Sequence, residues 1–174
     1  VRYTDDRAVT AGHDHTDDEP KPHDHAEGAG PTRTYEEVLE IIDRMDLAAA
    51  VAGRARATVE RLGRAEAAVH DTDLTATIFH EVGADDAIAD IVGASLLLAD
   101  LDPERLVTTP VATGGGQTKT DHGRYPVPTP AVVELAADAD WSLWGGPVDA
   151  ELLTPTGAAI LAEIADGVDG ATPE

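Results

Sequence analysis

The sequence predicts an α/β fold, a helix-rich mixed α/β layer domain with a disordered N-terminal tail rich in His and Asp. Several segments carry apolar residues at helical intervals, and short β-prone runs alternate with them. The first 31 residues show no apolar period and have a composition typical of disorder. We therefore expect three parts: a tail (1–31), a folded domain (32–167) and a short C-terminal tail (168–174).

Five helices are expected in the folded domain. Thr34 followed by Glu37 has the capping-box spacing, and the apolar residues that come next predict a first helix at about 35–45. A third helix is expected to be capped by Asp85. The other helices are expected at about 47–70, over 130–137 and at about 155–165.

Strands and extended segments are expected between the helices. The runs 77–82 and 106–112 are short and β-prone, and WSLWGGPVD (141–149) suggests a strand and a turn in which both tryptophans pack. RYPVPTPA (124–131) is expected to be extended, because each proline biases the residue before it away from the helix.

Composition restricts the partners and the chemistry. The formal net charge is -22, which argues against nucleic acid because phosphate binding needs clustered Lys and Arg. Acids scattered along the chain, with only two lysines, look like adaptation to high salt. Cysteine is absent, so any metal must be bound by imidazole, carboxylate or backbone oxygen. With neither a membrane-length apolar stretch nor a signal peptide, we expect no membrane partner and a cytoplasmic location.

The segment FHEVGADDAIAD (79–90) places an imidazole close to several carboxylates. Asp86 and Asp90 are four residues apart and would project from one face of a helix, which suits a hard or borderline metal. A structural interpretation is also open, because Asp85 and Asp86 favour a helix N-terminus through capping and the dipole.

Two later segments suggest anion binding. The glycine triplet 114–116 follows a predicted strand, and the scarce cations Lys119 and Arg124 come soon after it, which could cradle a phosphate. A flexible loop is the alternative, because neither the P-loop nor the dinucleotide spacing is present. ELLTPTGAA (151–159) reads as a helix start, a general but unspecific anion site. His70, at the end of a predicted helix, is interpreted as structural.

HDHTDDEPKPHDH (13–25) contains two His-Asp-His triplets. Alternate residues of an extended chain point to the same side, so each triplet could chelate a divalent ion. A flexible tail cannot hold ligands to the tolerance that chemistry requires. We interpret this segment as a metal reservoir, with an inert linker as the alternative.

Four segments, in this order, resemble the LarC family of nickel-insertion proteins: IFHEVGADDAIADIVGA (78–94), TPVATGGG (109–116), DHGRYPVPTPAVVELA (121–136) and ELLTPTGAAIL (151–161). The resemblance implies a cyclometallase of the lyase class. It would insert nickel into pyridinium-3,5-bisthiocarboxylic acid mononucleotide in a CTP-dependent reaction, producing the nickel-pincer nucleotide cofactor of lactate racemase-type enzymes.

The resemblance also implies partners beyond the printed 174 residues. Family members carry a CTP-binding C-terminal domain with Mg or Mn, and a glycine- and serine-rich segment ahead of the His-rich one. We therefore expect this polypeptide to need the CTP-binding domain for activity, to serve a lactate racemase-type apoenzyme and to form a homo-oligomer.

Carried over by motif, the resemblance implies site residues of three kinds. The candidates for catalysis are His80, Glu81, Asp85 and His122. The candidates for metal binding are His80, Glu81, Asp90 and His122, in addition to His13, His15, His23 and His25, which the alternate spacing in the tail suggests. The candidates for holding the nucleotide phosphate are Gly114, Gly115, Gly116, Lys119, Thr154, Thr156 and Gly157.

Two other interpretations remain. The chain could be a non-catalytic nickel-binding or storage module that uses its histidine tail, or a salt-adapted structural domain with no ligand. Deleting residues 1–30 separates the first from an insertion enzyme, because only a storage module depends on the tail.

Overall fold

The computed structural model describes residues 31–79, 83–120, 123–139 and 141–167. It confirms the predicted helix-rich α/β class. Within these ranges the helices are α1 (Tyr35–Asp43), α2 (Ala49–His70), α3 (Asp85–Leu101), α4 (Pro130–Asp138) and α5 (Pro155–Ile164), with a 3-10 turn at Leu74–Ala76. The expected tail 1–31 lies outside the described residues except for Pro31.

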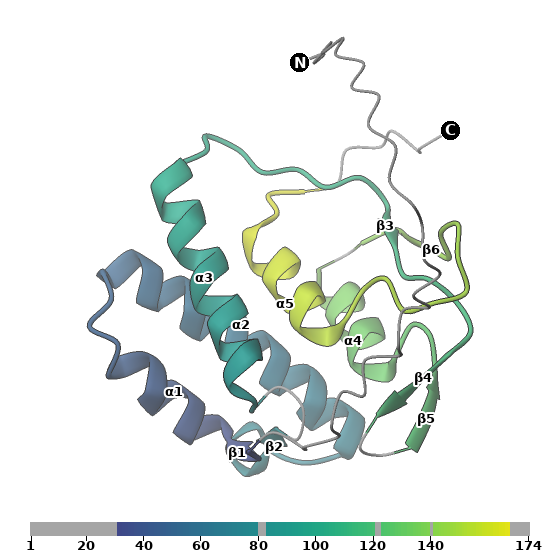
Figure 1. The fold of residues 1–174 in the computed structure, drawn as a ribbon, viewed down its shortest axis with the longest axis horizontal. Coiled ribbons are helices and arrows are strands. Elements are labelled where there is room, and N and C mark those ends of the chain that lie inside the picture. The colour runs from purple at the N-terminus through teal and green to yellow at the C-terminus, as the bar shows by residue number, and fades with distance from the viewer. Residues whose placement is uncertain (1–30, 80–82, 121–122, 140, 168–174) are drawn as a thin grey trace, which may run out of the picture.

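The long helix α2 organises the core. It packs against α1, α3, α4 and α5, and Figure 1 shows it running behind the other helices. Its stripe of Ala55, Val59 and Leu62 is fully buried, because small and branched side chains at helical spacing let neighbouring helices approach closely. On its outer side Arg61 bonds Asp138 of α4 at 2.6 Å and Glu163 of α5 at 2.9 Å.

The strands form three separate two-stranded ladders. Their bounds are β1 (Arg33–Thr34), β2 (Ile78–Phe79), β3 (Val111–Ala112), β4 (Gln117–Thr120), β5 (Gly123–Pro126) and β6 (Leu143–Trp144). The β1–β2 and β4–β5 ladders are antiparallel, and β3–β6 is parallel. The β4–β5 ladder lies beside α4 (Figure 1) and forms one wall of the site described below.

Two sequence predictions are corrected. The strand expected over 106–112 is limited to Val111–Ala112, because the backbone of Leu106 and Thr108 bonds instead to the loop after α5, at Asp166 and Gly167. The expected cap at Asp85 is also wrong. The N-cap of α3 is Ala84, and Asp85 sits in the first turn, where it pairs with Arg33 at 2.7 Å.

The capping box at the start of α1 is confirmed. The Thr34 hydroxyl accepts the Glu37 amide at 3.2 Å, and the Glu37 carboxylate accepts the Thr34 amide at 2.8 Å. These bonds from Thr34 lower the pKa of Glu37, because they favour its charged form. Trp141 packs against the core as expected, whereas Trp144 remains 42% exposed.

Candidate functional site

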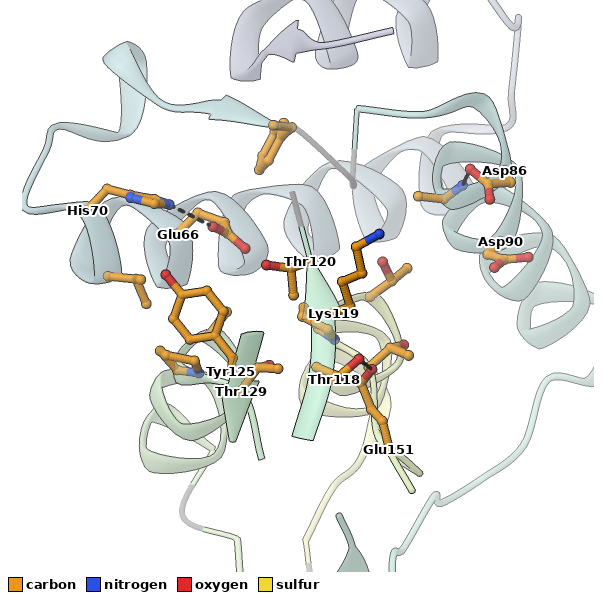
Figure 2. Close-up of a pocket in the computed structure, with 18 residues that line it drawn as sticks. Glu66, His70, Asp86, Asp90, Thr118, Lys119, Thr120, Tyr125, Thr129 and Glu151 are labelled. Carbon is orange, nitrogen blue, oxygen red and sulfur yellow. Dashed lines mark hydrogen bonds and ion pairs between the residues drawn. The ribbon is translucent and has the colours of Figure 1, made fainter. Parts of the chain in front are cut away.

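A pocket of about 310 Å³ lies where α2 ends and where α3, α4 and α5 begin (Figure 2). The β4–β5 ladder and Phe79 of β2 complete its wall. Helix N-termini carry unpaired N–H groups and the positive end of the dipole, so three of them around one cavity make a polar site. The three N-termini differ in which side chains, if any, accept hydrogen bonds from their first-turn N–H groups.

In α3 and α5 a side chain at the start of the helix bonds one amide of the first turn. In the first turn of α3 the Asp86 carboxylate accepts the Ala87 amide at 2.9 Å. At the start of α5 the Thr154 hydroxyl accepts the Gly157 amide at 3.2 Å. Each bond occupies an amide that would otherwise face the pocket or solvent unpaired.

Helix α4 has no such arrangement. Thr129 occupies its N-cap position, yet its side chain makes no capping bond and the first turn carries no acid. The Thr129 side chain is 94% buried, with only 6% of the residue exposed, and its hydroxyl oxygen has no hydrogen-bond partner. Buried hydroxyls are normally bonded, so this group at the pocket wall stands out.

The end of α2 contributes an imidazole and a carboxylate. His70 Nε2 lies 3.6 Å from a Glu66 carboxylate oxygen, one helical turn away, and both line the pocket (Figure 2). The Tyr125 ring lies on the same side of the pocket (Figure 2). An imidazole next to a carboxylate can accept a proton or ligate a metal ion.

Acidic groups outnumber basic ones around the cavity. Four carboxylates line it, against the single lysine Lys119, and they belong to Glu66, Asp86, Asp90 and Glu151. Glu151 accepts the Thr118 hydroxyl at 3.0 Å. The excess of negative charge attracts cations. Among the described residues, however, three His, Asp or Glu side chains nowhere gather closely enough to hold a metal ion by themselves.

Comparison with known proteins identifies the family. The family model described as nickel insertion protein matches residues 3–174. The chain belongs to this family. Its relatives include a protein of Synechococcus sp. (strain JA-3-3Ab), 41% identical over 82% of this chain and 36% of that protein. A protein of Methanosarcina barkeri is 42% identical over 76% of this chain and 34% of its own length. One of Archaeoglobus fulgidus is 43% identical over 74% of this chain and 33% of its own length.

These three relatives carry the name "Putative nickel insertion protein". The chain spans about a third of their length. No solved structure matches it. Within the described ranges, none of the helices has the length and hydropathy needed to cross a bilayer.

The nickel-insertion motifs named in the sequence meet at the pocket. Three of the four segments line it: 78–94 through Phe79 and Asp90, 121–136 through Tyr125 and Thr129, and 151–161. Asp90, Lys119, Thr154 and Thr156, predicted from the sequence, are all part of the wall. Asp85 is exposed and engaged with Arg33 instead, and Gly157 is used by the α5 cap.

The glycine triplet does not line the pocket but supports the segment that does. Gly114 has a φ of 86° and bridges Glu151, and a Cβ at this position would lie 1.7 Å from the Ala150 carbonyl oxygen. Gly115 and Gly116 likewise approach Asp149. This close approach, which only glycine permits, brings the Glu151 segment to the cavity.

Several predicted ligands fall outside the described residues: His13, His15, His23, His25, His80, Glu81 and His122. Conversely, sequence reasoning did not single out Glu66, Thr129 or Tyr125, and it gave His70 only a structural role. The four-residue spacing of Glu66 and His70 was the available signal for that pair. For Thr129, nothing in the sequence separates a capping threonine from one that is not capping.

Proposed function

We propose that this chain forms the nickel-handling part of a protein that inserts nickel into pyridinium-3,5-bisthiocarboxylic acid mononucleotide. The product would be the nickel-pincer nucleotide cofactor of lactate racemase-type enzymes. Membership of the nickel insertion family supports the metal. The observation that carries the proposal is the convergence of three sequence motifs, far apart in the chain, on one acidic pocket.

Nickel is the substrate that the acidic wall would attract. Asp90 lies in this wall. The other ligands predicted for the folded domain, His80, Glu81 and His122, lie outside the described residues. Imidazole and carboxylate hold a borderline metal less firmly than thiolate, so a cysteine-free protein can release nickel to the sulfurs of the substrate.

Insertion also requires a base. When nickel bonds to a carbon of the pyridinium ring, the C–H bond breaks, its electron pair forms the nickel–carbon bond and a proton must leave. The imidazole of His70, beside the Glu66 carboxylate, can take that proton. We therefore assign His70 the role of general base, with Glu66 orienting the imidazole ring.

The CTP requirement belongs, in this proposal, to the remainder of a longer protein. The chain corresponds to about a third of its relatives, and a C-terminal domain that binds CTP with Mg or Mn would complete the activity. The complete protein would be a lyase that supplies a lactate racemase-type apoenzyme.

The test combines this chain with the CTP-binding part of the protein, Ni²⁺, CTP and the dithiocarboxylate mononucleotide, and follows the nickel-pincer product by mass spectrometry. We expect product with wild type and with a variant lacking residues 1–30. Loss of product on removing the tail alone would favour a storage module, and no product from wild type would contradict the proposal.

The same assay tests the base. His70→Ala should lower the rate of product formation on the order of 100-fold or more, as expected for loss of general base catalysis. Glu134→Gln, an exposed change on α4 outside the pocket, is the matched control and should keep the wild-type rate. A wild-type rate in His70→Ala would remove the assignment.

A further inference from the structure

We propose that Thr129 and the first turn of α4 bind the phosphate group of the mononucleotide. This inference rests on the proposed function for the identity of the substrate. It assigns the phosphate to a different place from the glycine triplet and the α5 start suggested by the sequence. The site consists of the Thr129 hydroxyl and the backbone amides at the beginning of α4.

The backbone at the start of α4 supplies donors that the helix itself does not use. The first amides of a helix have no acceptor within the helix. In α4 these are the amides of Ala131 and Val132, since Pro130 has none and Val133 already bonds the Thr129 carbonyl at 3.1 Å. With neither an acid in the first turn nor a capping side chain, the positive end of this dipole faces the pocket uncompensated.

The Thr129 hydroxyl independently indicates a ligand. Thr129 lines the pocket and is only 6% exposed, and its buried hydroxyl oxygen has no partner; burying an unbonded hydroxyl is unfavourable. Beside a helix N-terminus the favourable partner for its O–H group is a negatively charged oxygen. A phosphate has several such oxygens and can accept from the hydroxyl and the amides together.

Acidic side chains and the α4 N-terminus occupy different parts of the pocket wall. Figure 2 shows Asp86 and Asp90 on α3, on the opposite side of the cavity from Thr129 and Tyr125, whereas Glu66 lies beside His70 on the Tyr125 side. The α3 acids favour a cation, and the α4 N-terminus favours an anion. A molecule with a metal-binding ring at one end and a phosphate at the other can reach both.

The experiment measures how much the phosphate contributes to binding. Isothermal titration of the 174-residue chain compares two probes: pyridinium-3-carboxylate mononucleotide and the corresponding nucleoside without phosphate. We expect wild type to prefer the mononucleotide. Thr129→Val, which keeps the shape but lacks the hydroxyl, should lose about 10-fold or more of that preference, as expected for a hydrogen bond to a charged group.

Two further variants make the result specific. Thr129→Ser restores a hydroxyl and should retain the preference. Thr72→Val makes the same change at an exposed threonine that does not line the pocket, and it should also retain the preference. Circular dichroism establishes that each variant is folded.

The proposal is overturned if wild type binds neither probe or both equally, or if Thr129→Val keeps the wild-type preference for the mononucleotide. Because these titrations contain no nickel or CTP, they separate the subsite from the insertion reaction. Pincer product from wild type together with an unchanged preference in Thr129→Val would remove the subsite and leave the proposed function intact.

Discussion

The same dipeptide, Thr-Pro, begins both α4 and α5, and the two copies behave differently. Thr129 and Thr154 have similar extended backbones, with φ and ψ of -69° and 157° at the first and -83° and 159° at the second. Both line the pocket. Thr154 is exposed and caps its own helix, whereas Thr129 is buried and its hydroxyl is unbonded.

The two helices also differ three residues further on. In α5 that position is Gly157, whose amide donates to the Thr154 hydroxyl at 3.2 Å. In α4 it is Val132, which is fully buried in the core. A threonine ahead of a helix is therefore a cap or a binding group according to its tertiary surroundings.

The largest expected effect comes from removing the packing that seats α4. Leu135 is 2% exposed, so Leu135→Ala should lower the free energy of unfolding by about 2–5 kcal/mol through lost burial and a cavity. Val133→Ala, at a site on the same helix that is 46% exposed, should cost less than about 0.5 kcal/mol. Urea denaturation measures both, and equal losses would show that α4 is not held by this face.

A smaller effect is expected at the α5 cap. Thr154→Val removes the hydroxyl that accepts the Gly157 amide, so the free energy of unfolding should fall by about 1 kcal/mol. The same urea titrations on Thr129→Val are the comparison, and there no capping bond is lost. A Thr154→Val variant as stable as wild type would contradict the claim that the Thr154 cap stabilises the protein.

The smallest effect concerns the complete capping box of α1, a reference for both other threonines. Glu37→Ala should lower the urea midpoint slightly near neutral pH, because it removes the reciprocal bond of an exposed capping box. The lowered pKa of Glu37 means that its stabilisation is present above the usual glutamate pKa and is lost as the pH falls through the lowered value. Urea midpoints of wild type and variant should converge in acid; a gap independent of pH would contradict this.

The helices were predictable because their signals are local. Each of the five expected segments contains a helix, and the Thr34–Glu37 box could be recognised from spacing alone. The extent of the strand expected over 106–112 could not be predicted from the local sequence. The backbone of this segment bonds to Asp166 and Gly167, and Leu106 and Asp166 are 60 residues apart in the chain.

The site was predictable only in part for the same reason. Asp90 and Lys119 were chosen for their residue type near expected helix and strand ends, and both line the pocket. The glycines 114–116 looked like ligand-binding residues because the sequence does not reveal that the approaching backbone is the protein's own, at Ala150. Thr129 was missed because burial and an unbonded hydroxyl are properties of the packed structure.

The most direct measurement is the thermal unfolding of wild type and Thr129→Val, each with and without the pyridinium-3-carboxylate mononucleotide. Without ligand the variant should be the more stable by about 1 kcal/mol, because it no longer buries an unbonded hydroxyl. With saturating mononucleotide the order should reverse, since wild type gains more from binding. A variant that is less stable in both conditions, or equally stabilised by the mononucleotide, would contradict the assignment of Thr129 to the substrate.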